Sequence, residues 1–294
     1  MTQGRVTLLT PTYGRDLERF KLLRESMERT GIDLPHVAVV QTEDVHLFRD
    51  LPHRHNLTVL TTADVLPAEI ERRRCWKFHS WRHPMYWLRG QPHAGWMTQQ
   101  VVKLASPTVI DTEAIVCLDS DVLFIRRLDA DDFFDAQGCL RFFESSDTAT
   151  IEEVRWQAES MEFFGIPVRG VPARQYVDML VPLRRDLLLE LQAAIAERGG
   201  GRSWAQTMIR HGLTEYTTYG VFARQVKKAN DLWSTAESMC MNYWNQTQAG
   251  RFQEYFLEEF GRSDFKAVMW NAAMQATPGP WFRPLIEEAW GRWA

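Results

Sequence analysis

The sequence lacks several features that would place it in a function class at once. Its four cysteines lie far apart and form no C-x-x-C pair, so neither a zinc knuckle nor a disulfide framework is indicated. No window approaches the run of about 20 apolar residues that crosses a membrane. A net charge of −4 supplies no basic surface for nucleic acid, which we therefore do not expect as a partner.

The first ten residues, MTQGRVTLLT, lack the charged start and long apolar stretch of a signal peptide. We therefore expect a cytoplasmic protein, with at most peripheral contact at the inner face of the membrane. Hydrophobic residues make up 45% and charged residues 24%, the proportions of a soluble globular protein. The 294 residues can form one large domain or two small ones, and the 12 tryptophans are unusually many.

Short apolar runs alternate with helical patterns along most of the chain. The expected strands cover residues 5–10, 36–42, 56–62, 112–121, 138–145 and 175–183, and helices are expected over 17–30 and 184–198. This alternation predicts an α/β fold with a Rossmann-like, mostly parallel central sheet flanked by helices. The C-terminal third, from about 230, has few strand signals and many aromatic residues, and we expect helices and loops folded over the sheet.

Two aspartates follow the apolar run AIVCL. Asp119 and Asp121 repel each other unless a cation lies between them, and hard oxygen ligands suit Mg²⁺ or Mn²⁺ carried by a diphosphate. The alternative is a loop in which one aspartate caps a turn and the other is solvated. A phosphatase of the haloacid-dehalogenase type would carry D-x-D-x-T near its N-terminus, whereas here Leu123 occupies the threonine position and several strands come first.

The first strand with its TPTYGRD turn, the mid-chain LDSDVLF, GWMTQQVVKL (95–104) and TEYTTYGVF (214–222) resemble GT-A-type glycosyltransferases. More narrowly, the last two resemble a poorly characterised bacterial group of glycosyltransferases. The resemblance runs from about residue 5 to 225. It implies a GT-A-like domain over 1–225 with a helical extension over 226–294. It also implies transfer of a sugar from a nucleoside-diphosphate sugar to a glycan, lipid-linked or small-molecule hydroxyl, with Mn²⁺ or Mg²⁺ on Asp119 and Asp121.

The resemblance implies that the turn after the first strand lines the nucleotide pocket. Thr10 and Thr12 offer hydroxyl groups, Tyr13 a stacking face and Arg15 a guanidinium for phosphate. The resemblance places Asp119 and Ser120 against the nucleotide as well. Asp16 is expected to cap the helix that starts at Leu17 rather than to contact a ligand.

The stretch 95–104 predicts an amphipathic helix with a polar face. Trp96, Gln100 and Lys103 share that face by their i, i+4, i+7 spacing. Lys103 could neutralise phosphate, Gln100 could bind a base or a sugar hydroxyl, and Trp96 could lie against a sugar. The alternative is an ordinary amphipathic helix whose polar residues are solvated. The neighbouring stripe, suited to the core, holds Met97, Val101 and Leu104.

Glu215 is the first candidate for the general base that an inverting transfer needs. It could instead position the acceptor in a retaining enzyme, or be a glutamate favoured at a helix N-terminus by the dipole. Tyr216 and Tyr219, three positions apart, are expected to flank a sugar ring. Asp178 is a second catalytic candidate, because a carboxylate inside a predicted strand needs a partner or a purpose.

A third metal ligand is not evident. The resemblance implies a histidine near the C-terminus, but the last histidine is His211, so Asp264, Asn271 or a water would have to substitute. The basic, tryptophan-rich segment 72–90 suits a lid or an anion contact, or aromatic packing of a long insertion. The terminal segment 281–294 suits a docked helix rather than a membrane-binding one, because Glu287 and Glu288 oppose anionic lipid.

Two rival functions remain open from the sequence. A sugar-1-phosphate nucleotidyltransferase shares the early strand and the metal carboxylates, but it carries a glycine-rich basic loop where TPTYGRD has one glycine. A non-catalytic carbohydrate-binding protein on a transferase fold is the other rival. The presence of Asp119, Asp121 and Glu215 opposes it.

Overall fold

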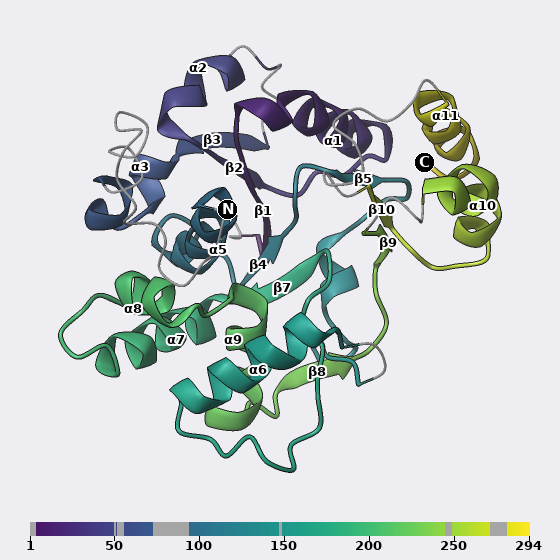
Figure 1. The fold of residues 1–294 in the computed structure, drawn as a ribbon. Helices are drawn as coiled ribbons and strands as arrows, with labels where there is room; N and C mark the ends of the chain where they lie inside the picture. The colour runs from purple at the N-terminus through teal and green to yellow at the C-terminus, as the bar shows by residue number, and fades with distance from the viewer. Residues whose placement is uncertain are drawn as a thin grey trace.

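The computed structural model describes residues 4–49, 51, 56–72, 94–146, 149–244, 249–270 and 281–294. Its centre is a five-stranded sheet in the order β3-β2-β1-β4-β7 (Figure 1). The four strands β1 to β4 run parallel, and β7 pairs antiparallel with β4. The strands cover Val6–Thr12 (β1), His36–Val40 (β2), Leu57–Thr61 (β3), Ala114–Cys117 (β4) and Val181–Arg184 (β7).

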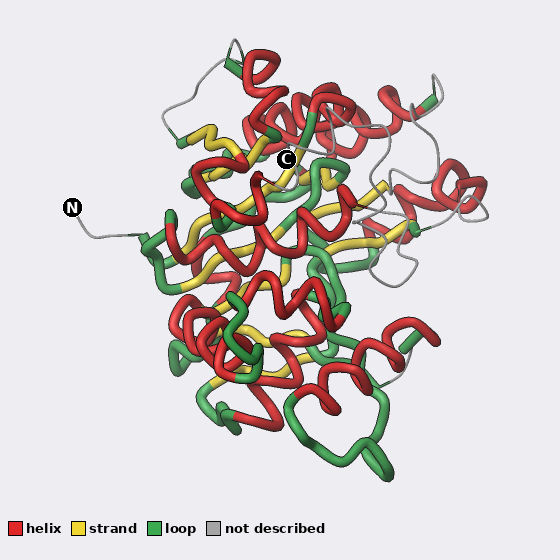
Figure 2. The backbone as a smooth tube through the Cα atoms, turned by 60° about the vertical axis from the view of Figure 1, so that its left-hand side comes forward, coloured by secondary structure: helices red, strands yellow, loops and turns green. Residues whose placement is uncertain are grey.

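Helices lie on both sides of the central strands (Figure 2). The helices of the first half are α1 (Leu17–Arg29), α2 (Val45–Phe48), α3 (Thr62–Val65) and α5 (Ala94–Ala105). Those of the second half are α6 (Ile151–Phe163), α7 (Arg185–Glu197), α8 (Trp204–His211), α9 (Glu215–Val221), α10 (Ala249–Gly261) and α11 (Phe282–Trp293). The predicted α/β class with a mostly parallel central sheet is confirmed. Within the described ranges, no helix has the length and apolar character needed to cross a membrane.

A second sheet, in the order β5-β10-β9, extends beyond the end of β4. It consists of Val122–Phe124 (β5), Cys240–Tyr243 (β9) and Ala267–Trp270 (β10). One face of this sheet packs into the main hydrophobic core, which surrounds the central sheet, through Val122, Phe124, Ala267 and Met269. The other face packs into a separate aromatic cluster through Leu123, Val268 and Trp270. This aromatic cluster, formed by buried residues of β5, β9, β10, α10 and α11, confirms the aromatic-rich C-terminal region.

The expectation of few strands after residue 230 is wrong, because β8 (Leu232–Thr235), β9 and β10 all lie there. These strands are only four residues long. In β9 and β10 both faces are largely buried, one in each cluster, so the apolar alternation that marks a half-exposed strand is absent.

Two of the predicted strands take different places. Residues 140–143 form β6, which pairs with β8 in a separate two-stranded sheet. Of the range 175–183, only Val181 onward is strand, because Leu180 adopts a left-handed conformation with φ 60°. Asp178 therefore lies in the loop before β7 rather than inside a strand.

Helix α1 begins at Leu17, as predicted, and Gly31 follows its end with φ 68°. The expected cap by Asp16 is wrong, because its carboxylate binds the Arg19 guanidinium at 2.8 Å instead. Burial raises the pKa of Asp16, and hydrogen bonds from Arg19 and Ser120 oppose that rise. Asp16 thus joins the turn after β1 to the turn after β4.

Candidate functional site

The D-S-D segment forms a tight turn between the central sheet and the second sheet. β4 ends at Cys117, and the next amide, that of Leu118, donates to the carbonyl of Leu9 in β1. The turn closes where the amide of Val122 donates to the carbonyl of Asp119 at 3.2 Å. The two aspartates therefore lie at the carboxyl edge of the parallel strands, where ligands bind in open α/β sheets.

Lys103 reaches this turn from the last turn of α5. Its ammonium lies 3.2 Å from Asp119 Oδ1 and 3.1 Å from Glu215 Oε1. The side chains of Lys103 and Glu215 are each only 4% exposed, whereas that of Asp119 is 34% exposed. We call Lys103, Asp119 and Glu215 the charged triad. It joins α5, the D-S-D turn and the start of α9 at one place that is open to solvent on the Asp119 side.

Burial and charge compete within the triad. Burial alone would lower the pKa of Lys103, but the neighbouring Asp119 and Glu215, together with Tyr216, raise it well above its usual value. Burial raises the pKa of Glu215, and the Lys103 ammonium opposes that rise. Lys103 is therefore fully charged at neutral pH and faces two carboxyl groups.

The contact between Lys103 and Asp119 is an ion pair that lacks the angles of a hydrogen bond. As a result, Asp119 Oδ1 is buried without a hydrogen-bond donor among the described residues. A carboxylate oxygen that accepts no hydrogen bond, next to a second aspartate, suits a hard cation. Mg²⁺ and similar ions take one or two protein carboxylates and complete their shell with substrate phosphates and waters. The residues present therefore fit Mg²⁺ or Mn²⁺ on Asp119 and Asp121.

A third protein ligand is not evident in the part of the chain that the structure describes, where no three His, Cys, Asp or Glu side chains gather around one point. Asp264 cannot substitute, because it precedes β10 at the Phe124 end of the β5–β10 ladder, whereas Asp121 lies at the Trp270 end. Asn271 lies outside the described residues, as does nearly all of the segment 72–90 considered as a lid.

Gln100 has a structural partner inside the protein. Its side-chain Oε1 accepts a hydrogen bond from the amide of Glu215 at 3.0 Å, and its exposed fraction is 4%. This amide is the first of α9, which otherwise needs a cap. Gln100 and Lys103, on one face of α5 as predicted, together fix both the backbone and the side chain of Glu215.

Asp178 forms a second buried acidic group. It accepts hydrogen bonds from the Ser238 hydroxyl at 3.0 Å and from the Asn242 amide at 2.6 Å. Burial raises the pKa of Asp178 to about 6, because the hydrogen bonds compensate only part of the lost hydration. Burial raises the pKa of the Cys240 thiol in β9, and the nearby carboxyl groups of Asp178 and Asp121 raise it further.

The turn after β1 divides into buried and exposed parts. The Thr10 hydroxyl lies 2.9 Å from His36 Nε2, and Thr12 is 5% exposed. Tyr13 is half-buried and Arg15 is exposed. Thr10 is therefore engaged inside the protein, while Tyr13 and Arg15 are the groups of this turn that a ligand can reach.

The aromatic residues proposed to surround a sugar separate into two groups. Tyr216 and Tyr219 are buried, at 4% and 2% exposed, and the Tyr219 hydroxyl accepts a hydrogen bond from the Arg184 amide. The ring of Tyr216 lies under the Lys103 ammonium at 4.7 Å. Both tyrosines thus pack in the core and present little surface to a sugar.

Trp96 remains half-exposed at the other end of the polar face of α5. It stacks on Trp156 of α6 with ring centroids 5.9 Å apart and an interplanar angle of 28°. Sequence reasoning missed Trp156 and Asn242. Nothing local marks either residue, because Trp156 lies on an ordinary helix and Asn242 on an unpredicted strand.

The fold and site define an α/β protein with a buried charged triad and a D-x-D turn at the carboxyl edge of a mostly parallel sheet. The chain belongs to a family of unknown function, DUF6492, whose model matches residues 5–260. No curated protein matches the sequence significantly.

Solved structures of glycosyltransferases are similar to this chain over most of its length. Galactosyltransferase LgtC in complex with donor and acceptor sugar analogues has 12% sequence identity and a TM-score of 0.43, with 98% of this chain and 96% of that chain covered. An active-site mutant of LgtC has 12% identity and a TM-score of 0.46, with 97% and 95% covered. Mouse xyloside xylosyltransferase 1 in its apo form has 10% identity and a TM-score of 0.46, with 93% and 99% covered. At such values the likeness carries no functional conclusion.

Proposed function

We propose that this protein is a glycosyltransferase that moves a sugar from a nucleoside-diphosphate sugar to a hydroxyl group of a glycan, lipid-linked or small-molecule acceptor. The observation that carries the proposal is the ion pair of Lys103 with both Asp119 and Glu215 beside Asp121. It brings a buried cation and several carboxyl groups to the sheet edge where a diphosphate would bind. The sequence motifs that resemble GT-A-type enzymes supply the same residues.

Lys103 would act on the diphosphate. Its ammonium is held in place by two carboxylates, so it needs no reorganisation when a phosphate arrives, and preorganised charge of this kind is effective where water is excluded. Arg15, exposed after β1, would add a second cation from the neighbouring strand. Asp119 and Asp121 would hold Mn²⁺ or Mg²⁺, which when bound neutralises the nucleoside-diphosphate leaving group.

Two carboxyl groups are candidates for the proton transfer. An inverting reaction needs a base that takes the proton of the acceptor hydroxyl as its oxygen bonds to the sugar. Asp178, with a pKa of about 6, is better poised for this at neutral pH than an ordinary aspartate. Glu215 is paired with Lys103 and 3% exposed, and it suits either the base or the residue that orients Lys103.

The first test is a thermal-shift screen of UDP, GDP and their sugar conjugates with and without Mn²⁺. A ligand at about 100 times its Kd stabilises the folded state by about 2.7 kcal/mol, which is roughly 5 °C for a chain of this size. We expect such a shift for at least one nucleotide only when Mn²⁺ is present.

Matched variants make the screen specific. Asp121→Asn should abolish the Mn²⁺-dependent shift, whereas Asp131→Asn, at an exposed position of the 3₁₀ turn Ala130–Phe133, should leave it unchanged. A shift that is independent of metal, or one that survives in Asp121→Asn, would count against the metal-assisted transferase. The absence of a shift with every nucleotide would favour the non-catalytic carbohydrate-binding alternative.

A further inference from the structure

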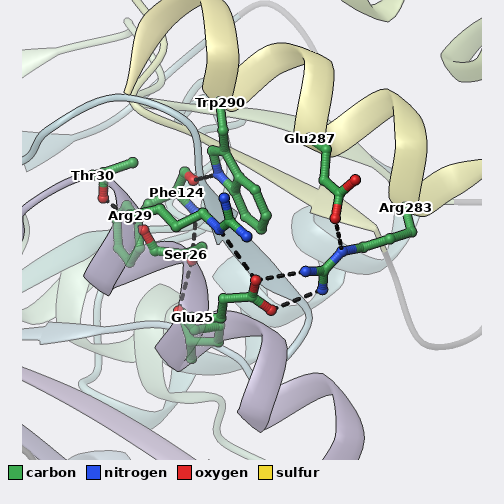
Figure 3. Close-up of polar contacts among 9 residues, drawn as sticks. Glu25, Ser26, Arg29, Thr30, Phe124, Arg283, Glu287 and Trp290 are labelled. Carbon is green, nitrogen blue, oxygen red and sulfur yellow. Dashed lines mark hydrogen bonds and ion pairs between the residues drawn. The ribbon is translucent and has the colours of Figure 1, made fainter.

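Strand β5, which follows the D-S-D turn directly, is an edge strand with one neighbour, β10. Its free edge is covered by side chains from two distant parts of the sequence. The amide of Phe124 donates to the Ser26 hydroxyl of α1 at 3.0 Å, and the carbonyl of Phe124 accepts from the Trp290 indole nitrogen of α11 at 2.8 Å (Figure 3). Both polar groups of this buried residue are therefore satisfied by side chains.

The indole of Trp290 is itself held by charges. Its ring lies 4.9 Å from the Arg29 guanidinium and 5.6 Å from that of Arg283, and the residue is 4% exposed. Glu25 joins these arginines, accepting from Arg283 at 2.6 and 2.8 Å and from Arg29 at 3.1 Å (Figure 3). The Arg283 guanidinium lowers the pKa of Glu25 below its ordinary value, so the bridge stays charged at neutral pH.

The other end of β5 is fixed at Asp121 itself. The amide of Trp270, in β10, donates to the carbonyl of Asp121 at 3.1 Å. Phe124 is only three residues further along, about 10 Å in an extended strand. Only Val122 and Leu123, both in β5, separate Asp121 from Phe124, so the side chains that support Phe124 act close to the D-S-D turn.

We propose that α11 is a positioning element for the D-S-D turn and that Trp290 is its positioning residue. Strand β5 is held between α1 and α11 by Trp290, Ser26 and the Glu25–Arg283 bridge. The position of β5 in turn sets the position of the Asp121 carboxylate. The family match ends at residue 260, so this helix lies beyond the region that the family model covers. The effect on metal binding rests on the function proposed above, whereas the effect on the turn does not.

The test compares two tryptophans of the same helix in the full-length protein. Trp290→Phe keeps an aromatic ring but removes the hydrogen bond to Phe124. Trp293→Phe is the matched control, because the Trp293 ring packs on Phe260 at 5.3 Å and near Arg126, beyond the end of β5, and does not take part in the hydrogen bond to Phe124. Hydrogen exchange of amides 119–125 reports on the turn, Mn²⁺ titration followed by electron paramagnetic resonance gives the Kd, and urea unfolding gives global stability.

We expect exchange in residues 119–125 to become about tenfold faster in Trp290→Phe, the effect of losing one buried hydrogen bond. The Mn²⁺ Kd should rise by roughly the same factor. Trp293→Phe should leave both unchanged even if its urea midpoint falls. Should Trp290→Phe fail to fold, Arg283→Met is the second variant, because it removes the bridge to Glu25, the pair with Glu287 and the guanidinium beside the Trp290 ring but keeps the Trp290 hydrogen bond. It should change both quantities in the same direction to a smaller extent.

The proposal is overturned if Trp290→Phe and the wild type have equal exchange rates and an equal Mn²⁺ Kd. It is also overturned if the exchange rates and the Kd change in both tryptophan variants only in proportion to the loss of global stability. A wild-type protein that binds no Mn²⁺ contradicts the function proposed above and the metal-positioning role together. In that case faster exchange in Trp290→Phe alone still supports the structural role of α11 in holding the turn, and unchanged exchange refutes it.

Discussion

Replacing Lys103 by methionine is the sharpest perturbation of the charged triad. The substitution keeps most of the side-chain volume and removes the charge, so that Glu215, whose side chain is 4% exposed, loses its cation. Breaking a buried ion pair by removing one partner costs about 3–5 kcal/mol, because the other charge remains buried without compensation. Asp119 adds little, since at 34% exposure water already screens it. We expect Lys103→Met to lower the free energy of unfolding by about 3 kcal/mol at pH 7.

Chemical denaturation in urea measures this loss, and a surface pair provides the control. Lys21 and Glu18 are 2.7 Å apart but 45% and 83% exposed, and Lys21→Met should cost no more than about 0.5 kcal/mol. In the double variant Lys103→Met/Glu215→Gln the orphaned charge is gone. We therefore expect it to recover about 1–2 kcal/mol relative to Lys103→Met alone.

The pH dependence gives an independent check on the same variant. Burial raises the pKa of Glu215, and without Lys103 the pKa should rise further. A carboxyl group whose pKa is raised in the folded state favours folding at low pH, and this contribution is lost as the pH rises through the folded-state pKa. The defect of Lys103→Met should therefore be smaller at pH 5 than at pH 8. A loss no larger than that of Lys21→Met, or a defect independent of pH, would refute the reasoning.

Two further predictions concern the surroundings of the triad. The pKa of Asp178 is raised from 3.8 to about 6, so its contribution to stability is present below about pH 4 and lost as the pH rises towards 6. Urea titrations at pH 4 and pH 7 should show that the fall in unfolding free energy between these pH values is about 2–3 kcal/mol smaller in Asp178→Asn than in the wild type. An equal fall in both proteins would show that Asp178 does not titrate in this range. Gly220→Ala should destabilise by about 2 kcal/mol or more, because its Cβ would lie 2.3 Å from the Tyr176 ring. At Gly291 the added Cβ would meet no described atom within 4 Å apart from its chain neighbours and the backbone of its own helix, so Gly291→Ala should instead stabilise by about 0.5–1 kcal/mol. Equal melting temperatures for the two variants would contradict this packing.

The central sheet could be predicted from the sequence because its strands are buried on both faces. Runs such as AIVCL in β4 are continuous apolar segments, which is typical of a parallel sheet covered by helices. The period of α5 likewise placed Gln100 and Lys103 on one face, where the structure has them. Helical and strand periodicity are local properties of the sequence, so they can be recognised from a single sequence.

The partners of these residues could not be predicted in the same way. Lys103 and Glu215 lie 112 positions apart, and nothing local indicates that their side chains meet. Asp178 looked like a strand residue because its neighbours are apolar, yet the left-handed Leu180 separates it from β7. Tyr216 and Tyr219 suggested a sugar-binding pair because they follow Glu215 three positions apart, but both side chains are buried in the structure. The cap by Asp16 failed because Arg19 and Ser120 compete for its carboxylate.

The sheet β5-β10-β9 has one apolar face in each of the two hydrophobic clusters and so acts as a shared wall between them. If either cluster lost its packing, one apolar face of the same three strands would become exposed to solvent. The two hydrophobic clusters should therefore unfold in a single calorimetric transition. An engineered cut in the chain between β5 and β9 would divide this sheet, so the two fragments should become soluble and ordered only when they are mixed.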